Sequence, residues 1–227
     1  MLDAAVDAPP DAPPPHVVRG NITDQDTGAP IVGGRTCILD HPEIACGTTD
    51  ITGSYTMALP QSLQGVDFAE SFTAAGYLGA VHLAGAGSFP GIILTGTALM
   101  SDASAAKLLQ QQAGFSYPAI DRGFVLLSVF FATGGAVVGA SVAATPSPDV
   151  APVYFDTSGP NLTLTATTTD GYLLLGGLPP GRIDISISGA TCAPFEHSFD
   201  GWEPAAPYAI AGEVAAGSLT KIFAVCH

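Results

Sequence analysis

The chain contains few charged residues for its length. Charged side chains make up 11% of its 227 residues, whereas 47% are hydrophobic, and an average globular protein has roughly 25% charged residues. Basic residues are the scarcest, because 6 Lys and Arg stand against 20 Asp and Glu and give a formal net charge of -14. Such an acidic field repels phosphate groups, so we expect no binding to nucleic acids or anionic membrane surfaces.

Long apolar runs and enzyme motifs are also missing. No segment has the 18 or more consecutive apolar residues of a membrane-spanning helix, and the most apolar window, residues 124–142, predicts two buried strands around a turn. The sequence has no HExxH, no G-x-S-x-G, no phosphate-binding P-loop and no dinucleotide fingerprint. We therefore predict a protein that is not an enzyme and needs no cofactor or metal ion. Its histidines are scattered, at His16, His41, His82, His197 and His227.

The four cysteines divide into two per half of the chain: Cys37 and Cys46, then Cys192 and Cys226. This even division predicts one disulfide in each half and an oxidising compartment. A tight hairpin over residues 39–44 would place residues whose numbers sum to 83 opposite each other, so Cys37 would face Cys46. Cys226 can reach Cys192 only if the two segments are neighbours. A zinc site is the alternative, although no pair has the CxxC spacing of such sites.

One sequence pattern occurs twice. Residues 27–34 (TGAPIVGG) reappear as residues 133–140 (TGGAVVGA), and residues 48–55 (TTDITGSY) are matched by residues 168–172 (TTDGY). A period of roughly one hundred residues indicates a duplicated domain. The repeated residues belong to turns and strands, so they predict architecture rather than activity.

Short apolar segments separated by Gly and Pro turns predict an all-β protein of two tandem β-sandwiches. We expect residues 1–16 to form a disordered tether rich in Asp, Ala and Pro. The first sandwich is predicted over residues 17–98 and the second over residues 122–227. Residues 99–121 are predicted to form a linker that contains one short helix.

The linker helix is predicted over residues 101–113. Ser101 or Asp102 supplies an N-terminal cap, and Gly114 ends the helix. One face of this helix packs at the junction between the domains in this interpretation. The residues that share this face are Ala105, Leu108, Leu109 and Gln112.

Both copies of the repeat resemble a known family. The first copy carries Thr27-Gly28-x-Pro30-Ile31-x-Gly33, Thr49-Asp50 and Gly53-x-Tyr55, and the second carries residues 137–140, 169–172 and 178–181. This pattern resembles the carboxypeptidase regulatory-like domain, within the wider group of transthyretin-like and collagen-adhesin B-type sandwiches. The resemblance covers most of residues 17–190 and implies a Greek-key sandwich for each copy. Such domains are accessory modules of many proteins, so the resemblance implies no single activity.

The crosslinking chemistry of collagen-adhesin B-type domains does not carry over to this chain. Those domains often join a Lys on the first strand to an Asn or Asp. The lysines here are Lys107, on the predicted helix, and Lys221, on the predicted last strand. We therefore expect no such crosslink.

Residues 1–16 resemble the tether that follows the lipid-modified cysteine of bacterial surface lipoproteins. A simple disordered tail is the alternative. We predict an exported protein, either an outer-membrane or cell-surface lipoprotein or a secreted one. Membrane contact would occur only through an N-terminal lipid anchor that these residues do not include.

The best candidate for ligand binding is the stretch that holds the only tryptophan. Trp202 lies beside His197, Asp200 and Glu203 in a turn-rich segment, and an aromatic ring next to carboxylates suits a sugar. The alternative is a loop that covers one end of the sandwich, with Trp202 as its hydrophobic plug.

We predict a surface module with a structural, adhesive or carbohydrate-contacting role, whose partner is a polysaccharide or a cell-surface protein. One alternative is an accessory subunit of a secretion or polysaccharide-handling complex. Another is an enzyme whose site lies at the domain junction.

Overall fold

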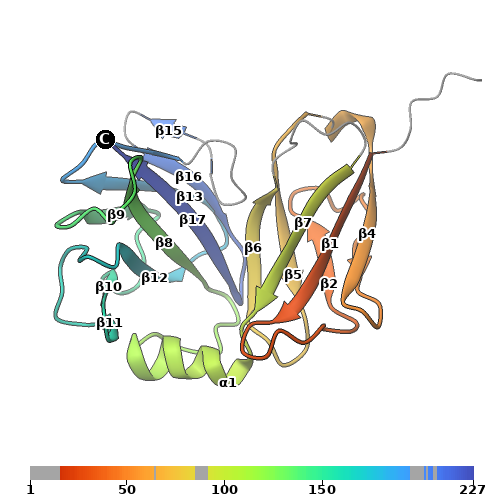
Figure 1. The fold of residues 1–227 in the computed structure, drawn as a ribbon, viewed down its shortest axis with the longest axis horizontal. Coiled ribbons are helices and arrows are strands. Elements are labelled where there is room, and N and C mark those ends of the chain that lie inside the picture. The colour runs from red at the N-terminus through yellow and green to blue at the C-terminus, as the bar shows by residue number, and fades with distance from the viewer. Residues whose placement is uncertain (1–15, 64, 85–91, 195–201, 203, 207–208) are drawn as a thin grey trace, which may run out of the picture.

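β-Strands form nearly all of the regular structure, as predicted. The computed structural model describes residues 16–63, 65–84, 92–194, 202, 204–206 and 209–227. Two β-sandwiches lie side by side, with the helical segment below them in the view of Figure 1. Most predicted strands are present within one or two residues of the expected bounds.

The N-terminal half is a sandwich of two layers. In the first layer the first strand lies between an antiparallel and a parallel neighbour. This layer has the order β4-β1-β7, with β1 (His16–Asp24), β4 (Ser54–Leu59) and β7 (Ile92–Leu99). The facing layer has the order β3-β2-β5-β6, with β2 (Arg35–Ile38), β3 (Gly47–Thr48), β5 (Phe68–Thr73) and β6 (Gly79–Ala84). A single turn of 3-10 helix, η1 (Gln61–Leu63), follows β4.

The C-terminal half repeats this arrangement with additional strands. Its first layer has the order β11-β10-β12-β8-β17, and β14 also pairs with β17. The strands of this layer are β8 (Gly123–Phe131), β10 (Val153–Asp156), β11 (Gly159–Asn161), β12 (Tyr172–Leu178), β14 (Cys192–Pro194) and β17 (Ser218–Cys226). The facing layer has the order β15-β16-β13-β9, with β9 (Ser141–Thr145), β13 (Gly181–Ser188), β15 (Pro204–Ala206) and β16 (Ala209–Val214).

The two halves share one continuous sheet. Residues 79–81 of β6 pair in parallel with residues 218–220 of β17, which joins the second layer of the N-terminal half to the first layer of the C-terminal half. All six residues of β6 are buried. Ala80 and Ala84 belong to the core of the N-terminal half, whereas Val81 and Leu83 belong to the core of the C-terminal half. β6 is therefore part of both cores.

The linker helix consists of α1 (Asp102–Ala105) and a π-helical continuation, η2 (Ala106–Gln112). The Ser101 side chain caps it by accepting a hydrogen bond from the Ser104 amide. The predicted buried face is wrong at one position, because Gln112 is exposed and Ala113 is buried instead. The helix packs against Phe124, Leu174 and Leu219. No helix in the described part of the chain is long and apolar enough to cross a membrane.

Two predicted strands are much shorter than expected. The sequence predicts a strand over residues 44–49, where β3 contains only Gly47–Thr48. It also predicts a strand over residues 161–167, but β11 ends at Asn161. The Asn161 side-chain oxygen accepts hydrogen bonds from the amide and the hydroxyl of Thr163, at 3.0 and 2.7 Å. This local turn competes with strand pairing. β14, β15 and β16 were not predicted as strands.

Both predicted disulfides are present. The pairing of β2 with β3 has the predicted register, since paired residue numbers sum to 83, and the Cα atoms of Cys37 and Cys46 lie 4.5 Å apart. Cys192 lies directly opposite Cys226 in the pairing of β14 with β17. Each half therefore has one covalent link.

A buried threonine fixes the first repeated turn. The Thr49 hydroxyl donates to the Ile31 carbonyl at 2.6 Å and accepts from the Gly34 amide at 2.8 Å. The backbone of Thr49 also pairs with Gly33 and Gly34. The loop that contains the first copy of the repeat is thereby held against the strand ends.

Thr167 makes the same contacts in the second copy. Its hydroxyl donates to the Val137 carbonyl at 2.5 Å and accepts from the Ala140 amide at 2.9 Å. Thr49 and Thr167 are therefore equivalent positions, and the repeat extends to side-chain level. This alignment pairs Tyr55 with Leu173, whereas the sequence repeat had matched Tyr55 with Tyr172.

Candidate functional site

A cleft of about 220 Å³ lies between the two halves, beyond the last paired residues of β6 and β17. Both halves supply its walls. The residues that matter for its chemistry are Leu39, Asp40 and Leu83 from the N-terminal half and Arg182, Trp202 and Glu213 from the C-terminal half. These residues are distant in sequence, and the shared sheet and the packing of Leu39 and Leu83 on the C-terminal core bring them together.

Trp202 lines this cleft, and its side chain is buried. Its side chain is 6% exposed, and its indole N–H donates to the Lys221 carbonyl at 2.8 Å. Lys221 directly follows Thr220, the last residue of β17 that pairs with β6. The indole thus satisfies a backbone acceptor where β6 and β17 separate, which agrees with the plug alternative.

The other predicted ligand residues, His197, Asp200 and Glu203, lie outside the described residues. The structure therefore describes only Trp202 of the predicted sugar-binding set. That set as a whole stays a prediction.

The charged residues of the cleft are mostly acidic. Burial raises the pKa of Glu213, the nearby carboxylate of Asp40 raises it further, and Arg182 partly opposes both effects. The Arg182 guanidinium donates to Asp184 at 3.1 Å. Asp40 and Glu213 come from opposite halves, so their repulsion acts across the junction. Sequence reasoning missed these residues because no local motif contains them.

A second polar cluster lies inside the N-terminal core and is centred on Glu70 of β5. One carboxylate oxygen of Glu70 accepts from the Thr36 hydroxyl at 2.6 Å and from the Tyr55 hydroxyl at 3.0 Å. Tyr55 is also hydrogen-bonded to the Thr95 hydroxyl. The second oxygen, Oε2, is buried and has no hydrogen-bond partner. Burial raises the pKa of Glu70, although hydrogen bonds from the hydroxyls of Thr36, Thr95 and Tyr55 oppose this shift.

Gly20 leaves the space in which this cluster packs. A Cβ atom at Gly20 would lie 2.2 Å from the Thr95 carbonyl oxygen and 2.6 Å from the Tyr55 hydroxyl oxygen. Any other residue would displace the Tyr55 hydroxyl from Glu70. The sequence indicated that residue 70 lies on a strand, but alternation alone did not show that its carboxyl is completely buried.

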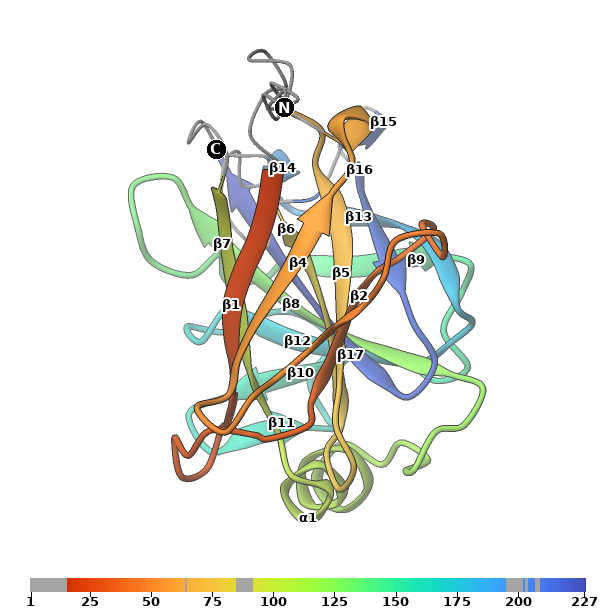
Figure 2. The same ribbon diagram turned by 90° about the vertical axis from the view of Figure 1, so that its right-hand side faces the viewer.

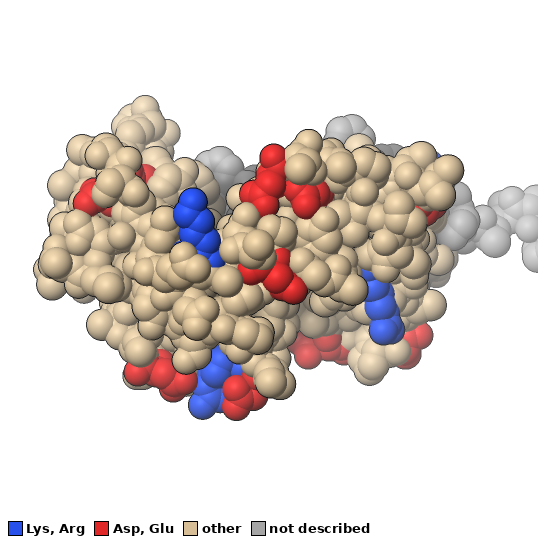
Figure 3. All heavy atoms as spheres, turned by 90° about the horizontal axis from the view of Figure 1, so that it is seen from below, with Lys and Arg blue, Asp and Glu red and all other residues tan. Residues whose placement is uncertain are grey.

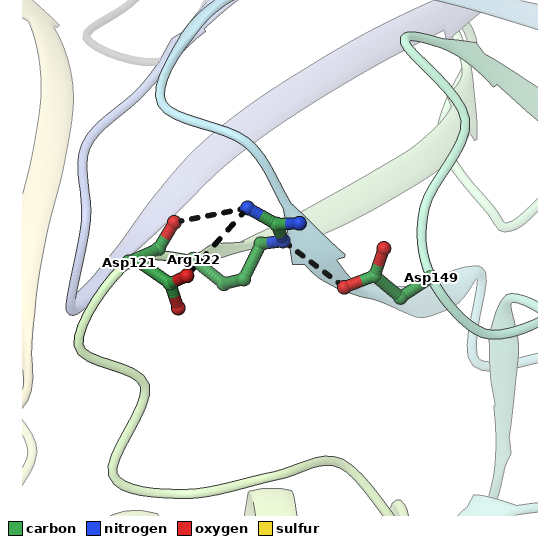
Figure 4. A network of polar contacts seen from close by, with 3 residues as sticks. All are labelled: Asp121, Arg122 and Asp149. Atoms are coloured by element: carbon green, nitrogen blue, oxygen red, sulfur yellow. Dashed lines mark hydrogen bonds and ion pairs between the residues drawn. The ribbon is translucent and has the colours of Figure 1, made fainter.

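Arg122 forms a third charged group at the start of the C-terminal half. Its Nε donates to the Asp149 carboxylate at 3.0 Å, and its terminal nitrogen lies 3.9 Å from an Asp121 carboxylate oxygen (Figure 4). These side chains are largely exposed, so we expect the pair to contribute little to stability. The group holds the loop of Asp149 against the start of β8, and its two carboxylates face one guanidinium.

The face that includes the linker helix is mainly uncharged, and its few basic side chains stand apart from one another (Figure 3). Within the described ranges, no group of three or more His, Cys, Asp or Glu side chains is placed to hold a metal ion. The junction cleft is therefore the best candidate site that the described residues provide.

Comparison with known proteins assigns the chain to no family. No protein-family model and no curated protein matches it. Several solved structures do. The Bacillus anthracis TIE protein is 12% identical, with a TM-score of 0.30, and the match covers 94% of this chain and 34% of that protein. A streptococcal ancillary pilin is 12% identical, with a TM-score of 0.27, and the match covers 94% of this chain and 62% of that protein. The shaft pilin SpaA of Lactobacillus rhamnosus GG is 13% identical, with a TM-score of 0.25, and the match covers 95% of this chain and 98% of that protein.

This chain thus spans about a third of the first of these proteins and less than two thirds of the second. The resemblance to the carboxypeptidase regulatory-like domain stays a prediction.

Proposed function

We propose that the chain is a non-enzymatic, exported module that serves as a rigid structural spacer at or outside the cell surface. The observation that supports this proposal best is the sheet that β6 and β17 share between the two sandwiches. Two domains on a flexible linker would move independently. Here backbone hydrogen bonds and a common buried strand resist such movement, and a disulfide in each half suits an oxidising environment.

The spacer role predicts one fixed distance between the halves. Spin labels at the exposed positions Ile51 and Leu162 would report this distance by double electron–electron resonance. We expect one narrow distance distribution for the otherwise unchanged protein. A broad distribution would contradict the proposal.

A junction variant sharpens this measurement. A Cβ atom at Gly79 would lie 2.4 Å from the Ser218 hydroxyl oxygen, so Gly79→Val should force β6 away from β17 and broaden the distribution. Ala58→Val, on the exposed side of β4, is the matched control and should leave the distribution narrow. Export itself is tested by labelling intact cells of the source organism with antibodies against the module. Signal only after permeabilisation would contradict it.

The junction cleft supports a second candidate role, contact with a carbohydrate. Its walls combine apolar side chains with the carboxylates of Asp40 and Glu213 and the guanidinium of Arg182, which is the mixture that a sugar requires. Trp202 lies in the same walls, so its fluorescence reports on the cleft. We expect a saturable change on titration with a suitable polysaccharide, and loss of that change in Arg182→Ala. Arg19→Ala, on the exposed face of β1, is the control and should retain it.

A further inference from the structure

The outer edge of β7 is an unpaired strand edge among the described residues. β7 pairs with β1 on one side, and no strand of that layer lies on its other side (Figure 2). A strand edge of this kind presents a row of backbone donors and acceptors that can pair with another strand.

The internal repeat shows what covers the equivalent edge in the other half. β7 and β17 are equivalent, because each is the parallel neighbour of the first strand of its half. Along β17 this edge is covered by β6 and then by β14. Leu219 of β17 lies under the linker helix and is 6% exposed, whereas its equivalent in β7, Ile92, is 39% exposed. The same fold position is an interface in one half and an open edge in the other.

The composition of β7 does not protect this edge. Natural edge strands are usually short or carry charged residues, Pro or bulges that prevent pairing. β7 has eight residues, IILTGTAL, without a charge or a proline. Leu94, which is 66% exposed, lies next to Ile92 on the outer face of the layer. This face continues onto Val17, which pairs with Ile92.

A second copy cannot cover this edge by repeating the internal junction. The strand that corresponds to β6 in the C-terminal half is β16, and its outer side already pairs with β15. The remaining self-complementary arrangement is β7 against β7 of the second copy. Two-fold symmetry makes such a pair antiparallel and closes both open edges at once.

We propose that two copies of this chain associate through their β7 edges and join the two three-stranded layers into one six-stranded sheet. Leu94 and Ile92 of the two copies would then meet across the new strand pair. This inference is independent of the proposed spacer role, which concerns the halves within one chain.

Analytical ultracentrifugation of the full chain tests the proposal. We expect the unchanged protein to sediment at twice the chain mass of 22.9 kDa at high concentration. Leu94→Lys places two like charges across the strand pair and should give a monomer. Leu162→Lys is the matched control, because Leu162 is also 66% exposed but lies outside β7, and it should remain a dimer. Circular dichroism melting checks that both variants are folded.

Two results would overturn the proposal. One is an unchanged protein that stays monomeric up to millimolar concentration, and the other is a dimer that persists in Leu94→Lys. A crosslinking experiment separates this edge from other surfaces. The four native cysteines are all in disulfides, so a single cysteine introduced as Leu94→Cys should form a covalent dimer on mild oxidation. Leu162→Cys should stay monomeric, and equal crosslinking of both variants would contradict the β7 pairing.

Discussion

The two halves have the same strand arrangement but opposite chemistry at the same core positions. The strand registers match six residues of the polar cluster and its surroundings with apolar residues in the other half. The matched pairs are Gly20 with Leu127, Thr36 with Val142, Tyr55 with Leu173, Glu70 with Ile185, His82 with Ile210 and Thr95 with Ile222. The C-terminal half shows that these layers close over an apolar set. The fold therefore does not require the polar set, and burial of the Glu70 carboxyl is a cost that only the N-terminal half bears.

The largest effect is expected from moving the carboxyl into the apolar half. Ile185→Glu should destabilise the protein by more than about 4 kcal/mol, because the new carboxyl would be buried without the hydroxyls that surround Glu70. Ile185→Val, the size control, should cost about 1 kcal/mol. Urea denaturation followed by circular dichroism measures both. Equal stability of the two variants would contradict the claim that only the N-terminal core is built to hold a buried carboxyl.

The two disulfides should differ in their contribution. Cys192 and Cys226 are separated by 34 residues, and Cys37 and Cys46 by 9. A longer closed loop restricts the unfolded chain more, so the Cys192→Ala/Cys226→Ala variant should lose about 4 kcal/mol and the Cys37→Ala/Cys46→Ala variant about 2.5 kcal/mol. Denaturation of each double variant gives the free energies of unfolding. The reverse order would show that native-state packing, rather than loop length, controls the difference.

The two turn threonines should be equivalent in energy as well as in geometry. Thr49→Val and Thr167→Val each leave one buried amide and one buried carbonyl without a side-chain partner, so each should cost about 2 kcal/mol. Thr56→Val, at an exposed position of β4, should change stability little. Thermal melts of the three variants make the comparison. A much larger cost in one half would show that only one turn supports its core.

The smallest effect, counted per pH unit, is expected from replacing the ionisable carboxyl of the polar cluster. Because burial raises the pKa of Glu70 in the folded state, the unfolded chain ionises first as pH rises. The contribution of Glu70 to the free energy of unfolding is fully present below the unfolded pKa of about 4.3. It is lost as pH rises through the folded pKa, with a slope of no more than about 1.4 kcal/mol per pH unit. Glu70→Gln keeps an acceptor for Thr36 and Tyr55 and should remove this dependence.

Unfolding free energies of both proteins from pH 4 to pH 8 make this test. The free energy of unfolding of the unchanged protein should decrease relative to that of Glu70→Gln as pH rises. Parallel curves would show that Glu70 ionises normally.

Local patterns were sufficient for most strands, the Cys37–Cys46 disulfide and the capped helix, because each rests on neighbouring residues. The Cys192–Cys226 disulfide was predicted from the even division of the cysteines between the halves. The register of β2 with β3 followed from the hairpin that contains Cys37 and Cys46. The helix cap was predicted as Ser101 or Asp102, and the structure shows Ser101. The parallel pairing of β6 with β17 could not be predicted, since no local signal connects residues so far apart in sequence. The cleft that includes Asp40 and Glu213 depends on this pairing, so the candidate site was predicted only at Trp202.

The position of β6 in two cores has a consequence for the order in which the chain folds. When the ribosome or an export channel has released only the N-terminal half, β6 can complete the first sandwich, but Val81 and Leu83 then face solvent. Their partners arrive only with β17, and contacts between such distant residues form slowly. The pairing of β6 with β17 in the ten-stranded sheet thus forms late. Until it forms, the partly folded protein exposes apolar side chains of β6 to which a chaperone or a second nascent chain can bind.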